Sequence, residues 1–140
     1  MRRSALLAVL VALVLAVPAS AGGNGKKSAV HKITQSASYL MIDPIYTTII
    51  DGDKIAGLLM IGIGLDVPNA ELRAQTEDEM PVLLDVYVRS LMAFTATSVR
   101  PWRQPDVGEI ADRLQRATDR TLGRRGARIL LAQVAMRLTK

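Results

Sequence analysis

The chain contains no cysteine and a single histidine, His31, and only 4% of its 140 residues are aromatic. Without cysteine, the chain can form neither a disulfide nor a lipid-carrying thioether. His31 lies in a stretch rich in Gly, Lys and Ser, so a hydrolase triad with a histidine base is not expected. The sequence also lacks a phosphate-binding loop, a complete dinucleotide fingerprint and a clustered set of metal ligands. We therefore expect a non-enzymatic protein with no cofactor and no metal.

The first residues have the pattern of a signal peptide. Two arginines precede an uninterrupted apolar run over residues 5–17, and Pro18 ends this run just before the small residues Ala19 and Ala21. This order of basic, apolar and small residues is typical of secretory signals. The run is shorter than the roughly 20 residues that a membrane-spanning helix needs. We expect cleavage after Ala21 and a periplasmic mature protein; the alternative is a retained anchor that holds the domain at the inner membrane, facing the periplasm.

The mature chain divides into a flexible leader over residues 22–38 and one domain over residues 39–140. Residues 39–42 and 45–50 are rich in β-branched and aromatic side chains and predict a strand, and Asp51-Gly52-Asp53 predicts a hairpin turn. Glycines in the return strand are typical of a bulge or a close backbone approach, which a partner chain or a packed helix could supply; they are Gly57, Gly62 and Gly64. Apolar residues at odd positions of that strand predict its core face; they are Ile55, Leu59, Ile61, Ile63, Leu65 and Val67.

A helical tract over residues 69–97 predicts two helices or one kinked helix. Thr76 and Glu79 have the spacing of a capping box just before Pro81. The second half of the tract is too apolar all round for a surface helix, so we expect it to lie across the sheet. Asp85 and Arg89, four residues apart, are expected to pair.

A further helix is predicted to open at Asp106 with Glu109 and to end at Gly123. A last strand follows over residues 127–139. The resulting order, β-β-α-α-α-β, predicts an α+β fold in which a small sheet containing an antiparallel hairpin is covered by helices on one face. The expected apolar stripe of the helix is Val107, Ile110, Leu114, Ala117 and Leu122, and the expected shared face of the strand is Leu130, Val134, Met136 and Leu138.

Charge is segregated along the chain. Residues 43–85 hold nine acids and two bases, whereas residues 100–140 hold ten bases and four acids. Complementary surfaces of this kind favour head-to-tail association of copies when they point in different directions. When they pair within one subunit, they favour no association. No nucleic acid is expected as a partner of an exported protein. The candidate self-association residues are Asp51, Asp53, Glu77, Asp78 and Glu79 on the acidic side and Arg113, Arg116, Arg120, Arg124 and Arg125 on the basic side.

The series of strand, hairpin and helices resembles the periplasmic domain of the FliL family of flagellar basal-body-associated proteins, whose fold is similar to stomatin-type domains. The resemblance covers about residues 39–139. It is carried by Tyr39-Leu40 with Asp43-Pro44, by Ile63-Gly64-Leu65 at the end of an apolar strand, by Pro81-x-Leu83-x-Asp85 leading to Ser90-Leu91, and by Leu122-Gly123.

The resemblance implies a ring-forming periplasmic protein that contacts the stator units of the flagellar motor and supports motility and chemotaxis without catalysing a reaction. Family members usually keep an N-terminal membrane helix, which this chain lacks if its signal is cleaved. A secreted paralogue that binds another envelope component, unrelated to motility, is therefore an alternative. A second alternative is an enzyme of unrecognised type that uses Asp43, Asp66 or Asp85.

Overall fold

The computed structural model describes residues 36–140, so the predicted signal peptide and all of the predicted leader except residues 36–38 lie outside the described residues. Its elements, in chain order, are β1 (Tyr39–Asp51), β2 (Lys54–Asp66), α2 (Ala70–Asp78), α3 (Met80–Ser98), α4 (Val107–Leu122) and β3 (Arg128–Leu138). The predicted order β-β-α-α-α-β and the α+β class are confirmed.

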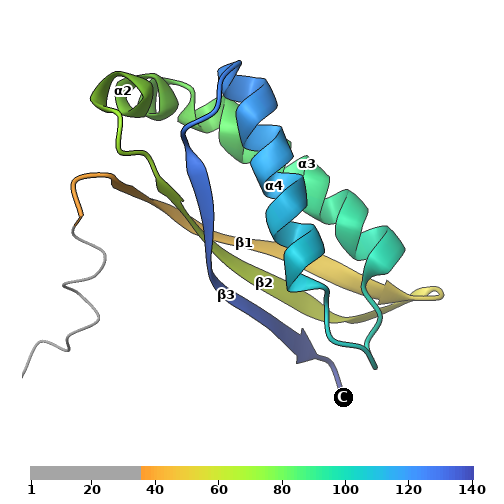
Figure 1. Ribbon diagram of the computed structural model, residues 1–140. Helices are drawn as coiled ribbons and strands as arrows, with labels where there is room; N and C mark the ends of the chain where they lie inside the picture. The colour runs from red at the N-terminus through yellow and green to blue at the C-terminus, as the bar shows by residue number, and fades with distance from the viewer. Residues whose placement is uncertain (1–35) are drawn as a thin grey trace, which may run out of the picture.

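The three strands form one antiparallel sheet in the order β1-β2-β3. The helices α3 and α4 lie side by side over one face of this sheet, and α2 lies beyond the end of the sheet that is opposite to the β1–β2 hairpin (Figure 1). The other face of the sheet carries no helix, as expected for a hairpin followed by helices and one closing strand. No helix within residues 36–140 is long and apolar enough to cross a membrane.

The core lies between the sheet and the two covering helices. In β2 the odd positions from Leu59 to Val67 are buried, which confirms the predicted core face over that stretch. Ile55 departs from this pattern and is exposed, because a register irregularity at Ile49/Ile50 separates it from the regular ladder. The fully buried residues of the helices are mostly leucines and aromatics, among them Leu83, Tyr87, Leu91, Phe94, Ile110 and Leu114.

The predicted face of β3 is partly wrong. A bulge at Ala132 separates the pair Gly62–Gln133 from the pair Ile63–Leu131, so the side-chain alternation changes phase there. Val134 and Met136 pack against the core after the bulge, but before it Ile129 and Leu131 do so instead of Leu130. Leu138, at the end of the strand, is exposed.

The helical tract forms two helices that meet at Glu79, which is one of the two predicted alternatives. The predicted capping box is wrong. Asn69 caps α2, since its side chain accepts a hydrogen bond of 2.8 Å from the Leu72 amide. Thr76 instead lies inside α2, fully buried, where its hydroxyl donates to the Leu72 carbonyl at 2.7 Å. Glu79 makes no side-chain cap for α3.

The helix α3 lies across the sheet as predicted, but it is not buried all round. Val82 and Met92 are exposed, so part of the apolar surface of this helix meets solvent. Arg89 pairs with Asp85 as expected. In α4, Asp106 caps the first turn and Gly123 ends the last turn in the left-handed conformation, both as predicted; of the predicted stripe, only Val107 is exposed.

Two buried hydroxyl pairs connect elements of the core, and the sequence pattern did not indicate either. The Thr47 and Thr95 hydroxyls lie 2.7 Å apart and join β1 to α3. The Tyr87 and Thr118 hydroxyls lie 2.6 Å apart and join α3 to α4. Since each hydroxyl is satisfied, these polar groups fix the position of the helices without leaving an unpartnered buried group.

Candidate self-association surfaces

The acidic hairpin protrudes from one end of the molecule. Asp51 ends β1, Gly52 takes a positive φ of 64°, and Asp53 precedes β2, so two carboxylates sit on an exposed tight turn. Within residues 36–140 neither carboxylate forms an ion pair. The turn therefore presents two free negative charges at the end of the sheet that points away from α2 (Figure 1).

The second acidic group lies at the other end of the molecule. Glu77 and Asp78 are exposed in the last turn of α2, and Glu79 follows as the junction with α3. The Glu79 carboxylate is half-buried and accepts a hydrogen bond of 2.9 Å from the Gln75 amide. Gln75 also donates to the Leu122 carbonyl at 3.1 Å, so this acidic group lies beside the C-terminal end of α4.

The basic residues of α4 divide into paired and free groups. Arg113 pairs with Glu109 at 2.8 Å and stacks over the Phe94 ring at 5.5 Å. Arg116 and Arg120, which are exposed, form no ion pair with any residue from 36 to 140. The end of the helix is paired more loosely, since Arg124 lies 3.8 Å from Glu71 and Arg125 lies 4.0 Å from Asp119.

The structure therefore does not gather the ten candidate residues into one acidic and one basic surface. The one ion pair between α2 and the basic segment after α4 joins Arg124 to Glu71, which is not among the ten. Among the ten residues, those that are exposed and form no ion pair in the described part of the chain are Asp51 and Asp53 on the hairpin, Glu77 and Asp78 at the end of α2, and Arg116 and Arg120 in the second half of α4.

Compared with known proteins, the chain matches no family model and no curated protein. Its surfaces must therefore be interpreted from their own chemistry.

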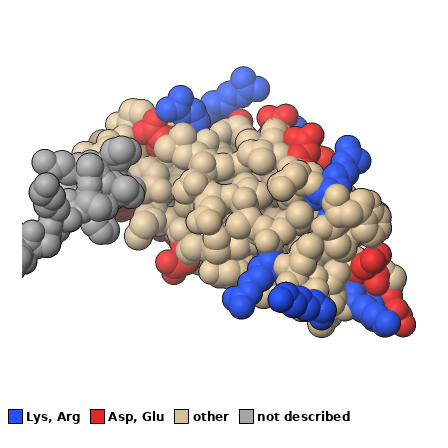
Figure 2. Space-filling view, turned by 90° about the horizontal axis from the view of Figure 1, so that it is seen from below, with Lys and Arg blue, Asp and Glu red and all other residues tan. Residues whose placement is uncertain are grey.

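The helix-free face of the sheet is largely apolar. Tyr46 is 60% exposed on β1, and the side chains of Leu58, Met60 and Ala135 border a shallow depression beside it. Seen from below, the molecule shows few charged side chains over the middle of this view, with most of them along its borders (Figure 2). Exposed apolar surface of this kind is typical of contact sites between proteins. The apolar character of this face was not predicted, although the large apolar residues at even positions, Tyr46, Leu58 and Met60, were a usable signal.

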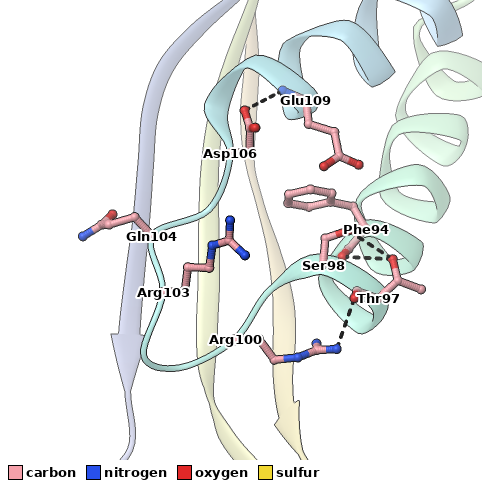
Figure 3. A pocket seen from close by; sticks show the side chains of 8 residues that line it. All are labelled: Phe94, Thr97, Ser98, Arg100, Arg103, Gln104, Asp106 and Glu109. Carbon is pink, nitrogen blue, oxygen red and sulfur yellow. Dashed lines mark hydrogen bonds between the residues drawn. The ribbon is translucent and has the colours of Figure 1, made fainter.

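A polar cavity of about 540 Å³ lies where α3 leads into α4. Its lining includes two arginines and two carboxylates, shown in Figure 3. Asp106 accepts a hydrogen bond of 3.0 Å from the Glu109 amide, and Arg100 donates to the carbonyls of Val99 and Thr97 at 2.8 and 3.2 Å. These contacts hold the loop between the helices, so much of the polarity of this cavity is structural.

The acidic residues considered for an enzyme lie on separate elements. Asp66 ends β2 and pairs with Arg128 at 3.2 Å, Asp85 pairs with Arg89 on α3, and Asp43 is exposed in β1. Residues 36–140 contain no group of three or more His, Asp or Glu side chains placed to hold a metal ion.

The perturbed tyrosine has a structural explanation. Burial raises the pKa of Tyr87 to about 12, the hydrogen bond with Thr118 acts in the opposite direction, and the charge of Asp119 adds to the increase. Its phenol bonds another hydroxyl in the core rather than facing a cavity.

Proposed function

We propose that this chain is an exported, non-enzymatic protein of FliL type that supports flagellar motility through contacts with stator and basal-body proteins and with copies of itself. The fold supports this proposal, because the element order β-β-α-α-α-β with helices on one face is the arrangement that the resemblance implies. The sheet face without helices supports it further, since an exposed apolar face suits a protein that acts by binding.

The observation that carries the self-association part is the separation of the free hairpin carboxylates from the free arginines of α4. Asp51 and Asp53 lie on the hairpin at one end, whereas Arg116 and Arg120 lie toward the other end of the molecule. A contact between unlike surfaces of two copies is heterologous, and it leaves one free surface on each outermost copy. Further copies can therefore add until a ring closes. The hairpin of one copy against α4 of the next is such a contact.

Charge reversal tests this contact. Changing Arg116→Glu and Arg120→Glu together should convert the oligomer to a monomer in sizing chromatography at low salt, because it places four negative charges against one another. Arg89→Glu, also on an exposed helical surface, is the matched control and should leave the oligomer intact. Reversing the hairpin, with Asp51→Arg and Asp53→Arg in the same chain, should restore the oligomer. An unchanged elution volume for the first variant would remove the contact.

Motility separates the flagellar role from that of a secreted paralogue. Deleting the gene should slow swimming in viscous medium, where the motor works under high load. If the parent strain exports the protein but the deletion strain swims at full speed, a different envelope partner is favoured.

A further inference from the structure

The two edges of the sheet are protected unequally. The free edge of β1 carries Asp43 and Pro44 at a register irregularity, and such features prevent strand addition because proline has no N–H to donate. The free edge of β3 has no proline, its two charged residues, Arg128 and Arg137, lie near its ends, and the bulge at Ala132 is its one irregularity. An edge of this kind accepts an additional strand more readily.

The second half of β3 also has its backbone groups available. Thr139 donates its N–H to Ala56 at 2.9 Å, toward β2, and successive residues of an antiparallel strand alternate in direction. Val134, Met136 and Leu138 therefore direct their N–H and C=O groups away from β2. No residue in the described part of the chain hydrogen-bonds to these groups, whereas upstream the outward N–H of Ile129 is taken by the Gln115 side chain at 2.9 Å.

A groove runs beside these open groups. The loop between α3 and α4 lies next to the end of β3 (Figure 1), and together they enclose a volume of about 440 Å³. Trp102, the only tryptophan in the chain, lines this groove and is 73% exposed. Pro101 lies on the same side, and Val134, Met136 and Leu138 line the other. The groove thus combines a strand edge with a large aromatic surface.

We propose that this groove binds an extended segment of a partner protein, which adds to β3 as a fourth strand and packs apolar side chains at alternate positions against Trp102. Main-chain hydrogen bonds to Val134, Met136 and Leu138 provide affinity in this mode of recognition, and the pocket beside the strand provides selectivity. The proposal deepens the proposed function, and it rests on that function only in requiring that the protein act by binding.

The charges around the groove define the partner further. Arg103 lines the groove, Lys140 follows the end of β3, and no carboxylate is among the lining residues. Neither cation forms an ion pair within residues 36–140. The segment that fits therefore carries acidic residues beside its apolar ones. A second copy of β3 fits less well, because it brings further arginines to the same edge.

A short blocked peptide that alternates isoleucine with threonine and has a glutamate at each end is the probe. Titrated into the purified protein, it should shift the fluorescence maximum of Trp102 to shorter wavelength, because the indole leaves water. A version with lysines in place of the glutamates should bind at least about tenfold more weakly, in line with the energy of close charge pairs at interfaces. Absence of a shift with the acidic peptide, or equal binding of the two peptides, would overturn the proposal.

Backbone pairing is tested by Met136→Pro against Met136→Ala. Both variants lose the same side-chain packing, but only the proline removes the outward N–H, which β2 does not use. Met136→Pro should bind the acidic peptide roughly 2- to 10-fold more weakly than Met136→Ala, as expected for one hydrogen bond. Equal binding by the two would contradict strand addition. Should Met136→Pro fail to fold by circular dichroism, Arg103→Glu, on the exposed loop, serves instead, and unchanged binding by that variant would contradict the charge recognition. None of these outcomes bears on the swimming test.

Discussion

The hydroxyl pair between Thr47 and Thr95 makes a sharp test of how the sheet and α3 are held together. The Thr95 hydroxyl donates its only proton to the Leu91 carbonyl at 2.8 Å, so it must accept the hydrogen bond from Thr47. Both side chains are buried, with 3% and 2% exposed. Replacing either threonine with valine keeps the shape of the side chain and removes one partner.

The two single changes should differ in size. Thr95→Val leaves the buried Thr47 proton without an acceptor and should lower the free energy of unfolding by about 2 kcal/mol, within the range for an unsatisfied buried group. Thr47→Val leaves a hydroxyl that still donates to Leu91, so we expect a loss of about 1 kcal/mol. The double change removes both polar groups together and should cost about 1 kcal/mol rather than the sum.

Urea denaturation followed by circular dichroism at 25 °C measures all three variants. The expected coupling energy is about 2 kcal/mol, the difference between the double change and the sum of the singles. Thr48→Val is the control, because Thr48 is the exposed neighbour on the same strand and should change stability by less than about 0.5 kcal/mol. Additive single changes would refute the hydroxyl pair and with it this account of how α3 is positioned.

Three further results are expected. The raised pKa of Tyr87 means that its neutral form is favoured in the folded state. The stability that this contributes is fully present below the unfolded pKa of about 10 and is lost as the pH rises toward the folded pKa of about 12. Relative to Tyr87→Phe, the parent should therefore lose about 1.4 kcal/mol of unfolding free energy per pH unit across that interval in urea titrations. A Cβ at Gly64 would overlap the Tyr39 ring, so Gly64→Ala should destabilise by roughly 1–3 kcal/mol, and by less in a Tyr39→Ala background, when measured by thermal unfolding. Asp106→Ala removes the cap of α4 and should cost about 1 kcal/mol in urea denaturation.

The sequence predicted the regular parts of the fold for physical reasons that the structure makes visible. Leu59 to Val67 alternate because one side of β2 is covered by helices, and this period is present in the residues themselves. The end of α4 was equally clear, because Gly123 supplies the left-handed residue that closes a helix. Local chemistry determined both features.

Features that depend on tertiary pairing were not predictable in this way. The bulge at Ala132 moved Leu130 off the core face, and nothing in the residue types of β3 indicates where a partner strand will shift register. Thr76 has the spacing of a cap but lies within α2, because Asn69 caps this helix about two turns before it. Spacing alone could not decide between the two.

The charges of the candidate surfaces were predictable from the sequence, but their positions on the molecule were not. The acidic and basic segments were evident in the sequence, but only the fold puts the acids of α2 beside the end of α4 and leaves the hairpin at the far end. The groove of Trp102 was not expected, because it joins a loop to a strand more than thirty residues later.

The proposed role in motility, through contacts between copies of this protein and with the motor, is tested by complementation. Swimming speed in viscous medium is measured in a deletion strain that expresses either the parent, the Arg116→Glu and Arg120→Glu variant, or the same variant with Asp51→Arg and Asp53→Arg. We expect the parent protein to restore swimming, the first variant to fail, and the second variant to recover it. Equal swimming with and without the protein would contradict the proposed role.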